Sequence, residues 1–277
     1  MPEGDTIHRA AAALRSALLG QRVERFEAPR LRGLLPQVGS TVESVEARGK
    51  HLEITFDDGI VLHTHMRMSG SWHLYRPQEK WRKRPEGARV VLQTETWLAV
   101  CFSAPVVEVY RQADRRRHPG LGSLGPDLCL PTADLIDCVE RMARFSYLHE
   151  QVAEVLLDQR VACGVGNVYK SEVLWACALD PFTPIEWVDE PLRLELLETA
   201  GRLLRANLQT EERTTLPGGG LAVYGRAGKP CRRCHGTIDV ARQGDHGRLT
   251  YWCAGCQVGP GAASSLRSGP VAGSRSR

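Results

Sequence analysis

The sequence predicts an α+β protein of more than one domain, with a β-rich N-terminal half, a helical second domain and a small metal-binding module. Three observations support this fold class. Apolar and polar residues alternate over residues 50–66 and in shorter runs up to residue 110, which is typical of strands. Beyond residue 131 the apolar residues recur at helical spacing. Residues 221–256 hold two closely spaced pairs of cysteines.

The first predicted element is a helix close to the N-terminus. Its apolar residues recur near helical period at Ile7, Ala10, Leu14 and Leu18. Asp5 is placed to cap the first turn, and Gly20 stands where a glycine commonly ends a helix.

Strands are predicted to follow this helix. Residues 50–66 alternate around Asp57–Asp58–Gly59, which is a hairpin signal. Further strands are expected over 88–93, 97–102 and 105–110. Residues 118–131 are rich in glycine and proline and are interpreted as a linker.

The second half is predicted to be helical up to a break at residues 214–220. Helices are expected over about 133–145, 149–159, 167–177 and 190–208. The predicted domains are residues 1–120, 121–220 and 221–257, followed by a Gly/Ser/Arg-rich tail over 258–277 that we expect to be disordered.

The composition is that of an ordinary globular protein. The chain has 277 residues, of which 42% are hydrophobic and 25% charged. This excludes collagen, a coiled-coil rod and a wholly disordered chain. No apolar run approaches the roughly 18 residues of a membrane span, and Glu3 and Asp5 stand where a signal peptide carries basic residues. We therefore expect a soluble intracellular protein with no membrane partner.

The basic residues are clustered, although the net charge is only +4. Arginine-rich groups occur over residues 82–84, 111–117 and 226–233. Such groups suit a polyanion, because each phosphate that they neutralise releases counterions. The alternative is a solvated charged face.

The cysteine spacing predicts a structural zinc site. Nine cysteines are an odd number, which argues against a disulfide framework. Cys231-x2-Cys234 is followed after 18 residues by Cys253-x2-Cys256, and four thiolates would fill tetrahedral zinc without an open position. Residues 236–240 and 248–252 are expected to form a hairpin with a polar tip. A redox CxxC pair is the alternative, and a zinc ribbon alone implies no chemistry.

The chain start offers a candidate nucleophile. Removal of Met1 would leave Pro2 with a secondary amine, and an α-amino group titrates near pH 8, so that a useful fraction is neutral at pH 7. Attack on an aldehyde carbon gives an iminium ion, which is an electron sink for elimination. Glu3 could pass protons beside it. The alternative is that Pro2 only stiffens the start of the chain.

Lys50 is a second candidate. It shares strand parity with Leu52, Ile54 and Phe56, which we expect to be buried. In an arginine-rich chain a lysine at this position is notable, because lysine can be tuned to release a proton and arginine cannot. An edge lysine with a buried stem is the alternative.

A third candidate lies between two predicted helices. Gly164 and Gly166 allow a tight turn, and Asn167 is placed at the N-cap of the next helix. Free N–H groups at a helix start bind anions, and Lys170 adds charge one turn later. The arrangement suits a clamp on DNA phosphates. An ordinary helical hairpin is the alternative.

Together these motifs resemble the formamidopyrimidine-DNA glycosylase/endonuclease VIII family of DNA base-repair enzymes, in the same order from residue 1 to about residue 257. The matching segments are Pro2–Glu3–Gly4, Arg48–Gly49–Lys50, Gly164–Val165–Gly166–Asn167 and the terminal run Tyr251–Trp252–Cys253–Ala254–Gly255–Cys256–Gln257.

The resemblance implies an N-terminal β-sandwich with an N-terminal helix, a helix–two-turns–helix domain and a four-cysteine zinc ribbon, with DNA in the cleft. It implies a bifunctional DNA glycosylase and abasic-site lyase of base excision repair. The Pro2 nitrogen would attack C1′ of a nucleotide flipped out of the stack, and Glu3 would protonate the sugar ring oxygen. Lys50 matches the β-elimination lysine. Arg248 matches the arginine that holds the phosphate and assists δ-elimination.

The resemblance also implies the partners. Asn167 matches the phosphate-contacting asparagine, Lys170 lies beside it, and Arg67 and Met68 stand in the segment whose methionine fills the gap left by the flipped base. We expect one structural zinc ion, damaged double-stranded DNA as partner, a monomer, and a bacterial-type cytoplasmic protein associated with the nucleoid.

The predicted lesion class is oxidised pyrimidines. The opening and Leu156–Leu157–Asp158–Gln159 resemble endonuclease VIII, and Thr214 to Val223 is shorter than the loop that caps 8-oxoguanine in formamidopyrimidine enzymes. The segment Met66–Arg67–Met68–Ser69–Gly70 resembles the other branch, and Ser123 replaces an arginine of endonuclease VIII. The alternatives are formamidopyrimidine/8-oxoguanine specificity and a catalytically silent damaged-DNA-binding protein. A zinc-ribbon adaptor for RNA or protein would explain the cysteines but not residues 1–50.

Overall fold

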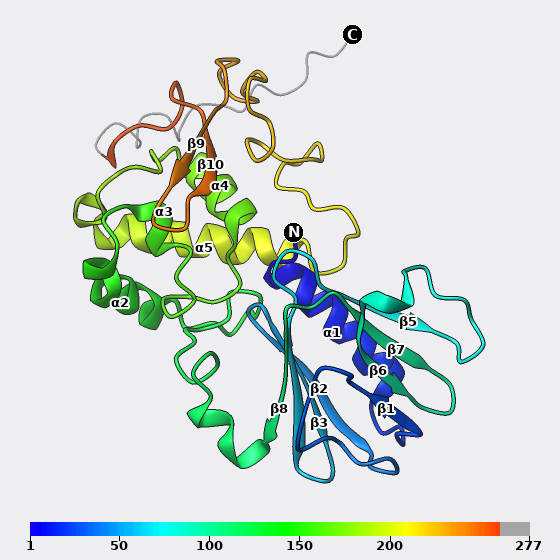
Figure 1. Cartoon of the computed structure of the whole chain (residues 1–277). Helices are drawn as coiled ribbons and strands as arrows, with labels where there is room; N and C mark the ends of the chain where they lie inside the picture. Colours follow the sequence, from blue (N-terminus) through cyan, green and yellow to red (C-terminus); the bar gives the residue numbers. More distant parts are fainter. Residues whose placement is uncertain (261–277) are drawn as a thin grey trace. The chain divides into compact units, whose positions relative to one another are not determined.

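The computed structural model describes residues 1–260, which divide into two compact units (Figure 1). The first unit is Met1–Leu124 and the second begins at Gly125. The boundary lies inside the Gly/Pro-rich segment that the sequence predicts as a linker. No helix within residues 1–260 combines the length and the apolarity needed to cross a bilayer.

The first unit is a sandwich of two four-stranded antiparallel sheets, as predicted. In order across one sheet are β1 (Arg25–Glu27), β6 (Ala88–Gln93), β7 (Leu98–Phe102) and β5 (Ser71–Tyr75). In order across the other are β2 (Val42–Arg48), β3 (His51–Phe56), β4 (Ile60–His65) and β8 (Val106–Arg111). The predicted hairpin is β3–β4, and the three further predicted strands are β6, β7 and β8.

The core of this unit lies between the sheets. Alternate residues of β3, such as Leu52 and Ile54, are fully buried in one apolar cluster with Leu92 and Ala99 from the other sheet. Each large apolar side chain buried in this way contributes roughly 1.5–3 kcal/mol to folding. The helix α1 (Gly4–Leu18) adds the apolar stripe predicted for it to the same cluster.

The start of α1 differs from the prediction. Glu3 occupies the N-cap and Asp5 lies inside the first helical turn, where it is fully buried. Asp5 is therefore not the capping residue, and the helix begins earlier than a cap at that position implies. Strands β1, β2 and β5 are additions to the predicted set.

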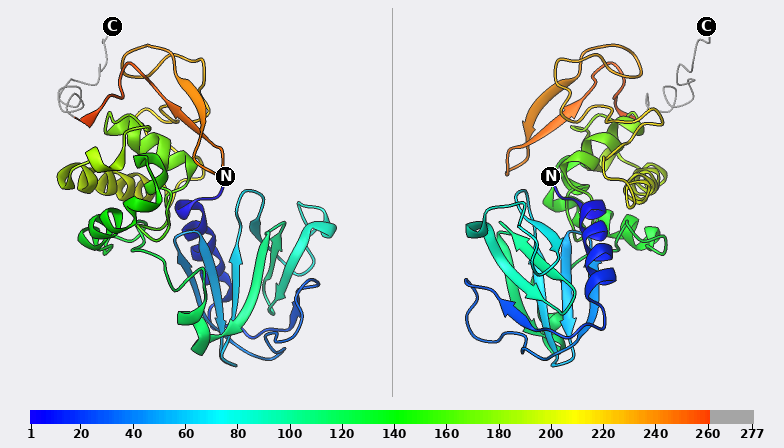
Figure 2. Two further views of the ribbon diagram at one scale, coloured as in Figure 1. Left: turned by 60° about the vertical axis from the view of Figure 1, so that its left-hand side comes forward. Right: turned by 90° about the vertical axis from the view of Figure 1, so that its right-hand side faces the viewer.

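The second unit begins with four helices (Figure 2). They are α2 (Leu135–Phe145), α3 (Val152–Val155), α4 (Asn167–Ala176) and α5 (Glu190–Ala206). Asp134 and Asp189 cap α2 and α5 by accepting the N–H of Asp137 and Leu192, each at 3.0 Å. The predicted helix over 149–159 is shorter than expected, because the chain leaves the helix after Val155 and forms turns.

The cysteine-bearing segment contains the hairpin β9 (Asp239–Gln243) and β10 (Arg248–Trp252), which packs on α4 (Figure 2). The second strand coincides with the predicted one, whereas the first begins three residues later than predicted. The predicted disordered tail covers residues 258–277, and of these residues 261–277 lie outside the described part of the chain.

Candidate functional site

The start of α1 lies at the same end of the first unit as the turn that holds Lys50. The N–H of Gly20 donates to the Val42 carbonyl at 2.9 Å, and Arg15 Nε donates to the Val45 carbonyl at 2.8 Å. The helix and β2 therefore run antiparallel. From Arg15 to Glu3 the helix spans about 18 Å, and from Val45 to Lys50 the strand spans about 16 Å. Glu3 and Lys50 therefore lie at similar distances from the contact between Arg15 and Val45, in the same direction along β2.

Glu3 is held by the beginning of the helix. Its backbone carbonyl accepts the N–H of Ile7 at 3.1 Å, and the residue is only 1% exposed. Pro2 precedes it with intermediate exposure, and Met1 is 43% exposed. The buried Glu3 is thus held by its backbone beside the chain start, whereas the terminus itself is accessible.

Lys50 lies in the Gly49–Lys50 turn between β2 and β3, with intermediate exposure. Lys50 therefore precedes the strand whose parity it was predicted to share, since β3 begins at His51. His51 pairs with His65, so the end of β4 meets the beginning of β3. The segment Met66–Gly70 therefore leaves the sheet at this same end of the unit.

The segment Met66–Gly70 is a tight, anchored loop. Met66 is buried, and its carbonyl accepts the Gly70 N–H at 2.8 Å. A Cβ on Gly70 would lie 2.7 Å from Met66 Cα, so only glycine fits there without a shift. Ser69 Oγ donates to the Ser103 carbonyl at 3.0 Å. Met68 is 77% exposed on this fixed base, as a side chain that enters a base stack would be.

In the second unit, Gln159 fixes the turn before α4. Its Nε2 donates to the carbonyls of Leu157 and Val165 at 2.8 and 3.0 Å, and its Oε1 accepts the Gly164 N–H at 3.1 Å. Gly164 has φ of +110°, which favours glycine. Gly166, not Asn167, is the N-cap, and Asn167 is the first helical residue.

Asp158 joins the same turn to the segment before α3. Its carboxylate accepts Arg160 Nη2 at 2.6 Å and lies 3.1 Å from His149 Nε2. Partial burial raises the pKa of Asp158, but the bonds from Arg160 and His149 outweigh it and hold that pKa below its usual value. The carboxylate is thus ionised at neutral pH and orders the turn.

Asn167 and Lys170 are buried and bonded to the hairpin. Asn167 Nδ2 donates to the Leu249 carbonyl at 2.6 Å. Lys170 is 1% exposed, and its Nζ donates to Asn167 Oδ1 at 2.8 Å and to Thr250 Oγ1 at 2.6 Å. Thr250 in turn donates to Gln243 Oε1 at 2.6 Å. The ammonium therefore joins α4 to β10 from within the unit.

Arg248 is exposed at the first position of β10, next to the hairpin tip. The tip is built on Gly244, where an added Cβ would lie 2.4 Å from Glu154 Oε1. Between this tip and residues 148–160 is a hollow of about 320 Å³. Its polar lining includes His149, Asp158, Arg160, Gln243, His246 and Arg248. The hairpin thus presents a cation beside a polar recess.

The four predicted metal ligands come together. The sulfur atoms of Cys231, Cys234, Cys253 and Cys256 lie within 4.8 Å of one another. The Sγ–Sγ distances are 3.7 Å for Cys231–Cys256 and 3.5 Å for Cys234–Cys253. These are close to the edge of about 3.8 Å that a tetrahedron with metal–sulfur distances near 2.3 Å requires, and far longer than a disulfide. The cluster can hold a metal ion.

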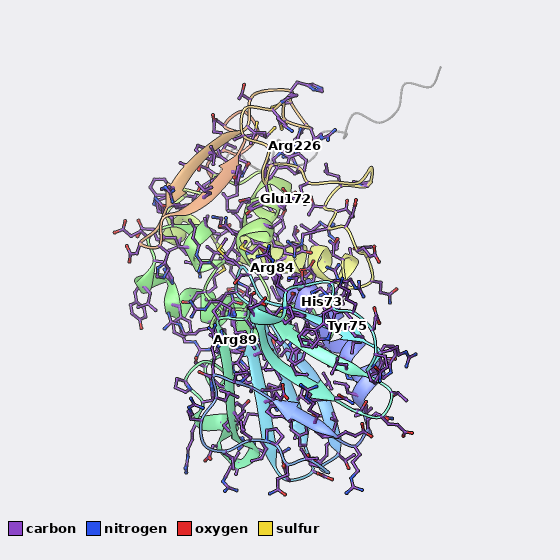
Figure 3. All side chains as sticks on the ribbon, turned by 45° about the vertical axis from the view of Figure 1, so that its right-hand side comes forward. His73, Tyr75, Arg84, Arg89, Glu172 and Arg226 are labelled. Atoms are coloured by element: carbon purple, nitrogen blue, oxygen red, sulfur yellow. The ribbon has the colours of Figure 1, made fainter. Side chains whose placement is uncertain are left out.

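A buried carboxylate that the sequence analysis missed fixes the chain leading to the cysteines. Glu172 lies on α4 (Figure 3). Its carboxylate accepts the N–H groups of Ala222, Val223 and Tyr224 at 2.8, 2.9 and 2.8 Å, and the Thr215 hydroxyl also donates to it. The spacing of apolar residues does not indicate that Glu172 is buried, because α4 is buried on every side from Asn167 to Trp175.

The comparisons with known proteins agree with this geometry. The family model described as the formamidopyrimidine-DNA glycosylase N-terminal domain matches residues 1–106, and the model of the H2TH domain of the same enzymes matches residues 124–216. The chain belongs to the formamidopyrimidine-DNA glycosylase family. The family predicted from the sequence is therefore confirmed, and with it the activity class of a DNA glycosylase and abasic-site lyase.

Relatives place this family member on the endonuclease VIII side. The "Probable endonuclease 8 2" of Streptomyces coelicolor is 39% identical over 97% of this chain and 98% of its own length. The "DNA-(apurinic or apyrimidinic site) lyase Nei2" of Mycolicibacterium smegmatis is 36% identical over 93% and 99%. A Lactococcus lactis formamidopyrimidine DNA glycosylase, solved with abasic-site DNA, shares the fold with a TM-score of 0.78 at 21% identity, covering 92% of this chain and 99% of that one.

Proposed function

We propose that this glycosylase and lyase acts through the Pro2 amine. The observation that carries the proposal is that the accessible chain start, the buried Glu3, the Lys50 turn and the exposed Met68 all belong to one end of the first unit. Excision of a flipped nucleotide needs a nucleophilic amine, a proton donor, a lysine that can accept a proton and an apolar side chain that fills the gap in the base stack.

The proposed reaction begins with removal of Met1. The Pro2 nitrogen attacks C1′ of the flipped nucleotide, the C1′–N bond breaks, and the base leaves with its electron pair and takes up the proton that the Pro2 nitrogen loses. Glu3 protonates the ring oxygen, so the sugar opens to an iminium ion. The iminium acidifies C2′–H, Lys50 accepts that proton, and β-elimination expels the 3′ phosphate. A second elimination expels the 5′ phosphate, which Arg248 holds, and water releases Pro2.

Contacts with DNA are proposed for Arg67, Met68 and Asn167. Met68 would fill the gap left by the flipped base, since it is exposed on a rigid loop. Arg67 lies beside it with φ of 44°, turned out of the strand direction. Asn167 would contact a phosphate at the start of α4. For Lys170 the burial of its ammonium favours positioning of Asn167 and the hairpin over a direct phosphate contact.

The ion in the cysteine cluster is proposed to be zinc. Four thiolates in tetrahedral spacing suit zinc and leave no open coordination position, so the ion would be structural. Trp175 Nε1 donates to Cys231 Sγ at 3.4 Å, as does the Arg233 N–H, which supports a thiolate there. When bound, the ion supplies no chemistry to the reaction and fixes the β9–β10 hairpin that bears Arg248.

The proposed substrates are oxidised pyrimidines in double-stranded DNA. Support comes from the endonuclease 8 relatives and from the short segment between Thr214 and Val223. The bacterial sources of these relatives support a bacterial-type cytoplasmic protein at the nucleoid, and we propose that it acts as a monomer. We propose domains over residues 1–120, 121–220 and 221–257, followed by the tail 258–277.

Borohydride trapping on abasic DNA tests the nucleophile. The mature protein should form a covalent adduct, and mass spectrometry should place the reduced deoxyribose on Pro2. Pro2→Gly should trap markedly less, whereas the control Pro29→Ala, which changes an exposed proline, should trap like the parent. An adduct on a lysine, or no adduct with full DNA affinity, would reject this function; the second outcome would indicate a catalytically silent DNA-binding protein.

A further inference from the structure

A histidine and glutamate cluster lies on the outer face of the sheet β2-β3-β4-β8, and none of its three members is placed in the reaction. His63 on β4 stands directly opposite Glu108 on β8 in the strand register. The chain then continues through a short helical turn, η2 (Gln112–Arg117), and returns His118 to the same carboxylate. Three chain segments therefore bring side chains to one point.

The distances in this cluster fit a metal centre. Glu108 Oε2 lies 3.1 Å from His63 Nδ1 and 2.9 Å from His118 Nε2. One ligand atom from each of the three residues lies within 4.8 Å of the others. Around a tetrahedral ion with metal–nitrogen and metal–oxygen bonds near 2.0–2.1 Å, adjacent ligand atoms are about 3.3 Å apart. Only small movements of the three side chains would admit such an ion.

The other nitrogen of His63 already has the partner that a metal-bound imidazole needs. His63 Nε2 lies 2.9 Å from His51 Nδ1, and the two rings are stacked with centroids 5.1 Å apart. An ion on Nδ1 leaves the Nε2 proton to donate to His51, which fixes the tautomer and the ring orientation.

Exposure leaves one side of the cluster open to solvent. The His63 side chain is 2% exposed, that of His118 17% and that of Glu108 48%. Three protein ligands from one side and water from the other form a recurrent zinc arrangement, with two imidazoles and one carboxylate. Imidazole nitrogen favours transition-metal ions over Mg²⁺ or Ca²⁺, which prefer all-oxygen sites.

We propose that His63, Glu108 and His118 bind a divalent transition-metal ion, zinc foremost, in a second site independent of the four-cysteine cluster. The ion would link β4, β8 and the segment that follows η2. It would thereby fasten residues 112–118 to the sheet.

Metal counting on the full chain tests the proposal. The protein is purified with one equivalent of zinc in the cysteine cluster, and further Zn²⁺ is added in a calorimetric titration with native mass spectrometry of the product. We expect a second equivalent to bind and to raise the unfolding temperature, because an ion that binds only the folded state stabilises it. Binding of Co²⁺ at this site should produce no thiolate charge-transfer band.

Two variants and a control locate the ion. Glu108→Gln and His118→Asn change partly exposed ligands, and each should weaken the second binding event at least tenfold while the first equivalent stays in place. His246→Asn changes an exposed histidine of the hairpin tip and should bind two equivalents. Thermal unfolding of each variant with zinc in the cysteine cluster alone checks that it folds.

Two results would overturn the proposal. If the parent protein with zinc in the cysteine cluster binds no second equivalent, His63, Glu108 and His118 are joined by hydrogen bonds alone. If a second equivalent binds but persists in both variants, the ion lies elsewhere. Neither result bears on the Pro2 reaction, which is measured separately by trapping.

Discussion

At the scale of single residues, Lys170 shows how the fold uses a charge. This lysine was predicted to face a phosphate. It is instead enclosed between α4 and β10, where Asn167 and Thr250 accept hydrogen bonds from its ammonium group. Burying an ammonium costs several kcal/mol unless its hydrogen bonds are made, so these bonds hold the two elements in one arrangement. We propose that its contribution to DNA binding passes through the position of Arg248.

Lys170→Met should lower the free energy of unfolding by about 2–3 kcal/mol, because it removes charged hydrogen bonds and leaves buried oxygens without a donor. Urea unfolding measures this, with the exposed Lys229→Met as the matched control. DNA affinity should fall as well. Parent-like stability combined with lost affinity would instead indicate that Lys170 contacts DNA directly.

Gly70→Ala tests the rigid base under Met68. The added Cβ would lie 2.7 Å from Met66 Cα and 2.9 Å from Ala104 Cα, both backbone atoms, so the loop must shift. We expect about 1–3 kcal/mol of destabilisation and slower excision from duplex DNA. Cleavage of abasic single strands, which need no base to be displaced, should change less. Gly218→Ala, at a position with open space around it, is the control.

At the scale of elements, the β9–β10 hairpin depends on two different anchors. The cysteine cluster holds its base, and the buried bonds of Gln243 and Thr250 hold its strands. Its tip carries Arg248 toward the polar hollow. The hairpin therefore positions an exposed cation without a large apolar core of its own.

Removal of the metal, or Cys253→Ala, should disorder the hairpin and weaken DNA binding at least tenfold. Fluorescence anisotropy with abasic-site duplex measures the affinity, and hydrogen exchange over residues 239–252 reports the order of the strands. Cys101→Ala removes a buried thiol from the sandwich and controls for lost packing. Full activity of the metal-free protein would contradict a structural role for the ion.

At the scale of the whole molecule, the modest net charge hides clustered arginines, and binding should depend steeply on salt. Each phosphate contact contributes a slope of about −0.9 to a plot of log K against log salt. Arg248→Gln should make the slope shallower by about one and weaken all duplex sequences alike. An unchanged slope with reduced cleavage would mean that Arg248 acts without holding a phosphate.

Some of the helices and strands of the whole molecule could be predicted from the sequence, and others could not. Helix α5 was predictable because its apolar residues follow the helical period, and strands β6, β7 and β8 were predictable because they are short apolar runs. The helix expected over 149–159 is confined to Val152–Val155, and the side-chain hydrogen bonds of Gln159 that order the following turn leave no trace in the apolar periodicity. The burial of Lys170 was likewise hidden, because it depends on Thr250, 80 residues away in the chain.

Glu172 has a consequence for the order in which the last part of the chain forms. Its carboxylate gathers three successive backbone amides beside Thr215, and none of these bonds involves a cysteine. Residues 222–224, which lead to the cysteines, are thus bonded to α4 independently of the ion. Chelation of the ion would therefore disorder β9 and β10 while residues 222–224 stay bonded to Glu172. When the ion binds again, only the segment that carries the four cysteines has to close around it, and the preceding chain is already in place.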